Sequence, residues 1–215
     1  MTGICGSGII EAIAELYLCG IISQDGLFDE SMMGRSNRII KEGRTCSYLL
    51  HKGEPELRIT QNDIRAIQLA KAALYAGIRL LMDHLGIEEV QRIRLAGAFG
   101  SHIDVKYAMI LGLIPDCDLD HVSSAGNAAG TGARMALLNH GSRREIEETV
   151  RKIEKVETAV EPAFQQHFVD AMAIPHKHAP STHLQKTVSL PEAKNNAQGN
   201  GDSTSRRRRS KRVVA

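Results

Sequence analysis

Three glycine-rich segments constrain the fold of this chain more than any other feature. They occupy residues 3–8 (GICGSG), 95–101 (LAGAFGS) and 124–132 (SAGNAAGTG). Each lies where the pattern of apolar residues predicts that a helix begins or a strand ends. Glycine allows left-handed backbone and close approach of a ligand, and a helix start offers unpaired amides to an anion. The sequence therefore predicts an α/β protein whose turns suit a phosphate-bearing ligand.

Two helices, a hairpin and a strand frame these segments. Apolar residues at helical spacing predict a helix over residues 9–18 and a second helix from Thr60, the N-cap, to Gly86. A hairpin with its loop near Gly53 is expected between the two helices. A buried strand over residues 90–96 then leads into the second glycine-rich segment.

The following part of the chain is predicted to be mainly helical. Caps and apolar spacing indicate, in chain order, a short helix from Asp104 to Gly112, a helix over 125–138 capped by Ser123 and Ser124, a charged helix capped by Ser142, a short strand over 156–160 and a last helix from Pro162. These elements complete a predicted domain over residues 1–175.

The composition changes after this domain. Residues 176–215 contain no aromatic residue and carry nine Lys or Arg against two Asp or Glu, whereas the first 175 residues carry 18 basic and 23 acidic groups. Such a segment buries too little apolar surface to fold alone, so a disordered basic tail is expected. Its run Arg206–Arg212 would attract RNA, DNA or acidic lipid without specificity. A purely solubilising tail is the alternative.

Composition also disfavours several classes of protein. No apolar stretch is long enough to span a membrane, and the first residues have no signal-peptide pattern, so a cytoplasmic location is expected. His176, His178 and His183 resemble a loose metal-binding tract, but a disordered segment is a poor setting for such a site. Four cysteines lie far apart without a C-x-x-C pair, which argues against a disulfide framework or a cysteine metal site: Cys5, Cys19, Cys46 and Cys117.

The first glycine-rich segment leads directly into a predicted helix. Gly6 and Gly8 would let the backbone approach a phosphate, and Ser7 can add a hydroxyl hydrogen bond. A plain tight turn before a helix explains the same residues equally well.

The second segment follows the carboxyl end of a predicted buried strand, the edge at which open α/β sheets bind ligands. Gly97 and Gly100 flank Ala98 and Phe99, so a flat ring such as adenine could lie against the backbone, with Ser101 beside it. A turn that only reverses the chain is the simpler alternative.

The third segment contains mostly small residues. Gly126 and Asn127 are predicted to form a polar wall of the same nucleotide pocket. Close packing of a helix on a sheet would require the same composition. If the functional interpretation holds, the backbone near Ser7, Phe99 and Asn127 converges on one bound purine nucleotide.

Taken together, these motifs resemble a known family. Their order and spacing are similar to those of the carboxy-terminal region of the reductive activators of corrinoid proteins, which are ATP-dependent, iron–sulfur-containing relatives of sugar kinases and actin. The similar segments are residues 3–11, 59–77, 95–104 and 126–130, within a resemblance that covers residues 3–175.

The resemblance implies a fold and an activity. The fold would be part of an actin-like (ribonuclease H-like) ATPase domain, with helices packed on a small mixed sheet. ATP or ADP with Mg would bind with Gly6, Ser7 and Gly8 near the phosphates and residues 97–101 at the adenosine. ATP turnover would support transfer of an electron to the cob(II)alamin of a corrinoid protein in a methyltransferase system, which returns the cobalt to Co(I). Lys71 lies on the helix before the adenosine motif, without a defined role.

The departure from the family limits these expectations. Complete members also contain a ferredoxin-like cluster domain and a first actin-like half, and this chain has no counterpart of the cluster cysteines or of the acidic phosphate loops. A fragment that needs the missing amino-terminal half or cluster domain is therefore expected. Two alternatives are half of an actin-like small-molecule kinase and a non-catalytic module that only docks a partner.

Overall fold

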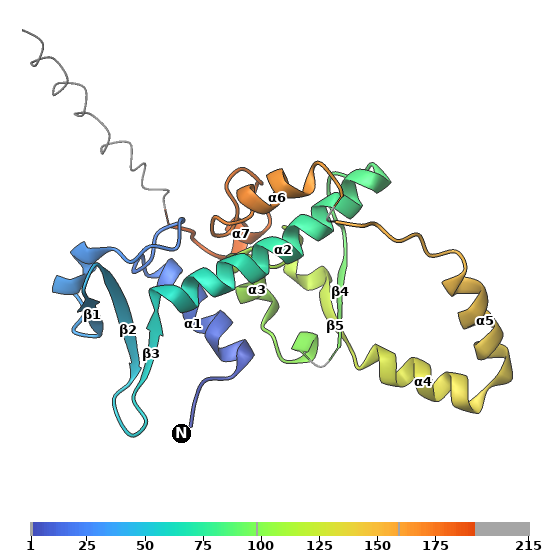
Figure 1. Ribbon diagram of the computed structural model, residues 1–215, viewed down its shortest axis with the longest axis horizontal. Helices are drawn as coiled ribbons and strands as arrows, with labels where there is room; N and C mark the ends of the chain where they lie inside the picture. The colour runs from blue at the N-terminus through green and yellow to red at the C-terminus, as the bar shows by residue number, and fades with distance from the viewer. Residues whose placement is uncertain (1, 98, 159, 192–215) are drawn as a thin grey trace, which may run out of the picture.

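The computed structural model describes residues 2–97, 99–158 and 160–191 (Figure 1). Its elements are, in chain order, α1 (Gly6–Leu18), the 3₁₀ helix η1 (Glu30–Gly34), β1 (Ile39–Glu42), β2 (Thr45–His51), β3 (Leu57–Thr60), α2 (Gln61–Leu85), β4 (Ile93–Ala96), η2 (Phe99–Ser101), α3 (Val105–Leu111), η3 (Leu119–His121), β5 (Val122–Gly126), α4 (Ala128–Leu138), α5 (His140–Val150), α6 (Phe164–Asp170) and α7 (Leu184–Thr187). Among these elements, no helix has the length and apolarity needed to cross a bilayer.

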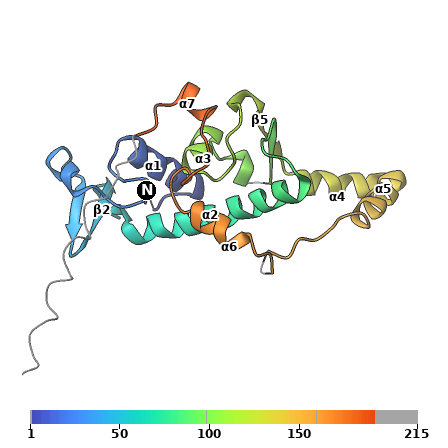
Figure 2. The same ribbon diagram turned by 90° about the horizontal axis from the view of Figure 1, so that it is seen from above.

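The long helix α2 crosses the molecule, with α6 packed along one side and α1 and α3 on the other (Figures 1 and 2). Its ends are as predicted. Thr60 and Asp63 form a capping box, in which each side chain accepts the other residue's backbone amide, and Gly86 ends the helix in the left-handed conformation. The predicted helix from Thr60 to Gly86 is therefore confirmed.

The predicted hairpin is also confirmed, and a third strand joins it. Strands β2 and β3 pair antiparallel, with Tyr48 opposite Ile59, and β1 pairs on the other edge of β2, with Ile39 opposite Tyr48. Strand β1 lies in a stretch whose apolar pattern is irregular. Only Ile39 of its four residues is buried. Sequence periodicity therefore gave no indication of it.

A separate pair of strands, β4 and β5, is parallel. Ile93 lies opposite Val122 and Ala96 opposite Gly126. The prediction that Ser123 and Ser124 cap a helix is wrong, because both belong to strand β5. Helix α4 begins only at Ala128.

The main core lies between α1, α3 and the three-stranded sheet. It is built from aliphatic side chains that are at most 5% exposed: Ile10, Ile13, Leu16, Ile39, Ile59, Ile64, Ile110 and Leu111. Helix α1 begins at Gly6, three residues before the predicted start, and runs to Leu18. Tyr107 on α3 donates a hydrogen bond of 2.5 Å to Glu15 on α1, which joins the two helices at the surface.

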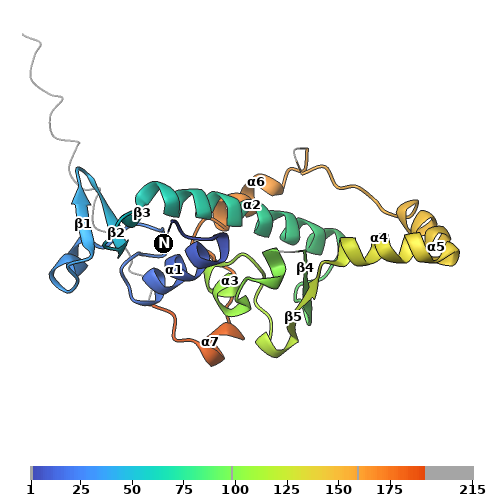
Figure 3. The same ribbon diagram turned by 90° about the horizontal axis from the view of Figure 1, so that it is seen from below.

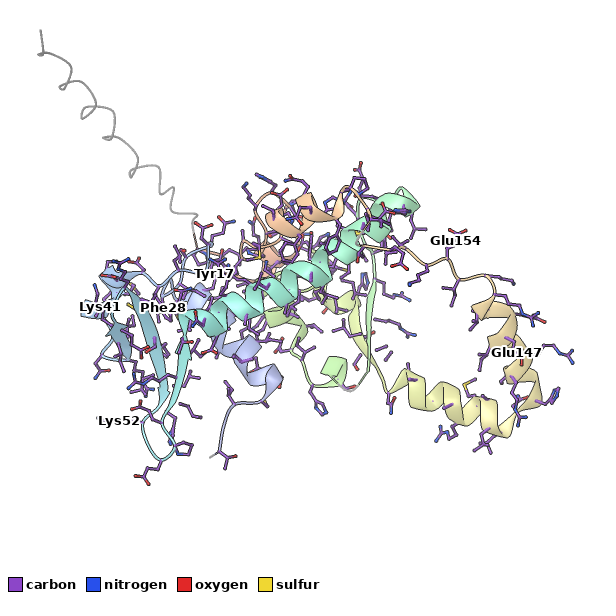
Figure 4. The ribbon with its side chains drawn as sticks, in the orientation of Figure 1. Tyr17, Phe28, Lys41, Lys52, Glu147 and Glu154 are labelled. Atoms are coloured by element: carbon purple, nitrogen blue, oxygen red, sulfur yellow. The ribbon has the colours of Figure 1, made fainter. Side chains whose placement is uncertain are left out.

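Helices α4 and α5 project away from the rest of the described chain (Figures 1 and 2). Helix α4 has no buried residue, and its Leu137 and Leu138 are 74% and 77% exposed. Helix α5 begins at His140 with Asn139 as its N-cap, so the predicted cap at Ser142 is wrong. No strand forms in the described residues of 156–160, of which residue 159 lies outside the description. Glu147 and Glu154, labelled in this region in Figure 4, are both exposed.

The expected boundary at residue 175 is too early. Asp116 accepts hydrogen bonds from the backbone amides of His183 and Leu184, at 2.8 and 2.9 Å, and thereby holds the start of α7. Leu184 is 1% exposed and belongs to the main core. Residues 176–191 thus pack on the body because one carboxylate and one leucine anchor them. The predicted disorder of residues 192–215 lies outside the described residues.

His176 also has a structural role in this segment. Its ring lies 4.8 Å from that of Tyr75, and its Nδ1 accepts hydrogen bonds from the amides of His178 and Ala179. Burial lowers the pKa of His176 to about 4, so the ring is neutral near pH 7. Within the described ranges, no group of three His, Cys, Asp or Glu side chains is placed to hold a metal ion.

Lys71 is buried in the middle of α2, at 1% exposure. Its ammonium donates hydrogen bonds to the carbonyl oxygens of Ala173 and Pro175, the latter at 2.8 Å. Burial lowers the pKa of Lys71 from 10.5 to about 7, because the interior disfavours the charged form.

This lowered pKa predicts a specific dependence of stability on pH. Between about pH 7 and pH 10.5 the unfolded chain binds one proton more at Lys71 than the folded chain does. The free energy of unfolding should therefore rise with pH in that window, by at most about 1.4 kcal/mol per unit. The Lys71→Met variant has no ionisable group at this position, so its free energy of unfolding does not show this rise with pH. Urea denaturation of both proteins at several pH values should show a difference in stability that grows in favour of wild type from pH 7 to pH 10. A difference independent of pH would contradict the lowered pKa.

Candidate functional site

The second and third glycine-rich segments meet at the carboxyl ends of β4 and β5. The amide of Gly97 donates a hydrogen bond to the carbonyl of Gly126 at 2.8 Å, directly after the paired residues Ala96 and Gly126. Both glycines have positive φ, 106° for Gly97 and 62° for Gly126, which side chains other than glycine rarely adopt. Parallel pairing thus places the two turns side by side, although the sequence predicted a strand only before Gly97.

Serine hydroxyls tie the two turns together. Ser101 donates from Oγ to the carbonyl of Gly97 at 3.1 Å, and its Oγ lies 3.3 Å from the Oγ of Ser124. Ser124 in turn accepts from the amide of Gly126 at 3.1 Å. Ser124 was not among the predicted site residues, because it was taken as a helix cap. Recognising residues 122–126 as a second parallel strand would have placed it at this edge.

Open space lies next to both turns. A Cβ atom built on Gly97 or on Gly126 would meet no other atom within 4 Å. A flat or anionic ligand can therefore approach the backbone at these two positions, and the residues present fit a nucleotide. Gly100 differs, because a Cβ there would lie 3.0 Å from that of Leu95 and close to its backbone. Gly100 is needed for packing of η2 on β4.

The structure does not describe the side chains of two predicted site residues, Ala98 and Phe99. Phe99 begins η2. Ala98 lies outside the described residues. The proposed contact of adenine with this part of the turn stays a prediction.

Asn127 caps helix α4. Its side-chain oxygen accepts the amide of Gly130 at 2.9 Å, so the carboxamide is fixed at the edge of the two turns. The unpaired amides at the start of this 11-residue helix face the same edge. The role of Asn127 as a polar wall of a nucleotide pocket stays a prediction, whereas the predicted caps Ser123 and Ser124 are replaced by Asn127.

The first glycine-rich segment forms the first turn of α1. Cys5 is the N-cap, and its Sγ accepts the amide of Gly8 at 3.4 Å and lies 3.3 Å from the Oγ of Ser7. These contacts, with the hydroxyl of Ser7 the largest cause, lower the pKa of the exposed Cys5 thiol. The start of α1 faces the same side of the molecule as η2 and the start of α4 (Figures 1 and 3). Hydrogen bonds join the second and third segments, whereas the first is linked to them through the packing of α1 on α3.

The architecture and motifs agree with a known family. The family described as "C-terminal domain of RACo the ASKHA domain" matches residues 1–185. The chain belongs to this family. The match confirms the resemblance found in the sequence and the actin-like, α/β class of the fold. The described strands of this actin-like domain form two small sheets, one antiparallel and one parallel.

Two relatives support this membership. The corrinoid activation enzyme RamQ of Eubacterium limosum is 37% identical, over 78% of this chain and 30% of RamQ. A solved structure of a reductive activator for a corrinoid, iron–sulfur protein is 34% identical, with a TM-score of 0.72 over 82% of this chain and 29% of that chain. The chain therefore spans less than a third of the length of each of these two relatives.

The packing of Gly100 leads to a prediction about the second turn. The Gly100→Ala variant should lose stability by about 1 kcal/mol or more, because the new methyl group would contact the backbone of Leu95, which has no room to move. Gly132→Ala is the matched control. A Cβ at Gly132 meets nothing within 4 Å and lies in a helix, so this variant should be equally or more stable than wild type. Thermal unfolding followed by circular dichroism measures both changes, and equal midpoints for the two variants would contradict the tight packing.

Proposed function

We propose that this chain is the nucleotide-binding, carboxy-terminal portion of an ATP-dependent reductive activator, which returns the cob(II)alamin of a corrinoid protein to Co(I). One observation carries the proposal. The hydrogen bond from Gly97 to Gly126 joins two open glycine turns at the carboxyl edge of a parallel strand pair, beside the start of helix α4. Ligands of α/β proteins bind at this kind of edge.

Different residues at this edge contact different parts of the nucleotide. The adenosine lies against the backbone of residues 97–101, where the open side of Gly97 admits a flat ring. Gly126 and Asn127 form the neighbouring wall. The phosphates extend toward the start of α1, where Gly6, Ser7 and Gly8 offer backbone amides and a hydroxyl at the positive end of the helix dipole.

The remaining parts of the activity belong to regions that the relatives have in addition. This chain matches 30% of RamQ, a corrinoid activation enzyme, and 29% of the solved reductive activator. We assign to the other regions the electron donor and the rest of the nucleotide site. ATP with Mg²⁺ supplies free energy for the uphill electron transfer, and the present chain binds and orients the nucleotide.

Nucleotide binding can be tested with the chain alone. ADP added to isotopically labelled protein should shift the backbone NMR signals of Gly97, Gly126 and Asn127. The Ser7→Asp variant should bind ADP about tenfold or more weakly, since a carboxylate near the phosphates costs about 1.4 kcal/mol or more.

The matched control for this variant is Asn62→Asp. It adds the same charge to the first turn of α2, where Asn62 is exposed. The control should bind ADP as wild type does. Shifts scattered over the surface, or equal affinity in the two variants, would contradict the proposed position of the phosphates.

A chimera tests the role in corrinoid activation. Replacing the corresponding 30% of RamQ with this chain should give a protein that reduces the cobalt of the RamQ corrinoid partner in an ATP-dependent reaction. The absorption spectrum of the corrinoid reports the Co(I) state. With Ser7→Asp the chimera should lose most of this rate at limiting ATP, and with Asn62→Asp it should keep it.

The two proposals can fail separately. A chimera that binds ATP but leaves the cobalt oxidised would refute the corrinoid role while the nucleotide site stands. A chimera that reduces cobalt equally well with Ser7→Asp would refute the position of the phosphates.

A further inference from the structure

A cavity of about 370 Å³ lies at the other end of the parallel strands. Residues 88–91, which lead into β4, and residues 115–118, which precede β5, line two of its sides. Tyr75, Arg79 and Met82 of α2 line a third side. The glycine turns follow the same two strands, so the lengths of β4 and β5 separate this cavity from the candidate nucleotide site.

The rim of the cavity carries more acidic than basic side chains, although the Asp116 carboxylate already accepts hydrogen bonds from Thr182, His183 and Leu184. It carries four carboxylates: Glu88, Glu89, Asp116 and Asp118. Arg79 also lines the cavity, but its guanidinium pairs with Asp83 on the same helix at 2.7 Å. Within the described residues, none of the four carboxylates has a Lys or Arg nitrogen within 4.0 Å. Charged groups gathered in this way attract a ligand of the opposite sign.

The buried residues Tyr75, Met82 and Cys117 form the floor of the cavity, which is apolar. Met82 is 6% exposed, Cys117 is 1% exposed, and the ring of Tyr75 is 9% exposed. A group that complements both the acidic rim and the apolar floor has a cationic end and an aliphatic stem. Arginine combines these features, since its guanidinium binds carboxylates with two parallel hydrogen bonds and its stem packs on apolar surface.

The chain itself contains a segment of this chemistry. Six of the seven residues in Arg206–Arg212 are Lys or Arg. Ala179, Pro180, Thr182 and His183 line the cavity, and the last described residue is Pro191. The fifteen residues from Pro191 to Arg206 reach up to about 50 Å when extended, which exceeds the radius of a body of this size.

We propose that the acidic cavity is an intramolecular docking site for the basic run Arg206–Arg212. Arginine side chains of the run pair with Glu88, Glu89 and Asp118, while one stem covers the floor between Tyr75 and Met82. Because the run is tethered to the same chain, its effective concentration is about millimolar, so contacts that are weak between separate molecules suffice. The proposal is independent of nucleotide binding, which takes place at the opposite end of the strands.

A zero-length cross-link tests this contact in the full chain. A carbodiimide joins an ammonium and a carboxylate only when they touch, and Lys211 lies within the run. At high dilution and low salt, mass spectrometry should find Lys211 joined to Glu88, Glu89 or Asp118 of the same chain. Links to carboxylates spread over the surface, links only between different molecules, or none, would overturn the proposal.

Charge reversal supplies the matched comparison. In Glu88→Lys/Glu89→Lys both altered residues are exposed, so the fold should survive while the rim becomes positive. Trypsin should then cut within the run at low salt about tenfold faster than in wild type, because the docked state no longer protects it. The control Glu147→Lys/Glu148→Lys has the same change of charge on α5, which projects away from the body in Figure 4, and should be cut as wild type is.

Two further measurements test how salt and added nucleic acid change the protection of the basic run from trypsin. Raising the salt to about 0.5 M should remove the protection in wild type, because screening weakens contacts between exposed charges. Equal cleavage of the two double variants would overturn the proposal. So would protection that arises only after a nucleic acid is added, since that would assign the run to a different partner.

Discussion

The buried polar face of α2 holds together parts of the chain that are far apart in sequence. Gln68 donates from Nε2 to the carbonyls of Asp25, at 3.1 Å, and Met172, at 2.9 Å, and Lys71 reaches the carbonyls of Ala173 and Pro175. These carbonyls belong to irregular segments, which have no strand or helix to satisfy them. Long polar side chains on a helix therefore take the place of secondary structure, and a buried carbonyl without such a donor would cost free energy. The segment that leads into α7 depends on this arrangement.

The small parallel pair of strands gives the domain two chemically different ends. At the carboxyl ends the chain turns through glycines and serines, with helix amides and hydroxyls that suit an anion. At the amino ends it enters the strands through carboxylates that suit a cation. The separation follows from parallel pairing itself, because both strands begin at one edge and end at the other. One short pair of strands thus separates an edge rich in glycine and serine from an acidic one.

Capping residues that can be recognised in the sequence predicted the helices whose ends they mark. The capping box at Thr60 and the glycine at Gly86 fixed α2, and Asp104 and Gly112 fixed α3. Strand β5 was missed because Ser123, Ser124 and the alanine after them have no apolar alternation, and they form a strand only through pairing with β4. Long-range pairing of this kind leaves no mark on the local pattern.

The same limit applies to the candidate site and to the domain boundary. The sequence placed Gly97 after a strand but Gly126 at the start of a helix, so their meeting at one edge became visible only through the pairing of β4 with β5. The anchoring of residues 176–191 by Asp116 could not be predicted, since the carboxylate lies more than sixty residues earlier in the chain. Buried Lys71 was also without a predicted role, because its partners are carbonyls about a hundred residues away.

Helix α4 starts at Ala128, directly after its N-cap Asn127 at the edge of the two glycine turns, and projects with α5 away from the rest of the described chain (Figure 3). Its direction therefore depends on the backbone at Gly126 and Asn127. Its 11 residues extend about 16 Å, so a tilt of about 10° at the first residue would carry the far end through about 3 Å. A small change of the backbone at Gly126 or Asn127 would thus produce a larger displacement of α5.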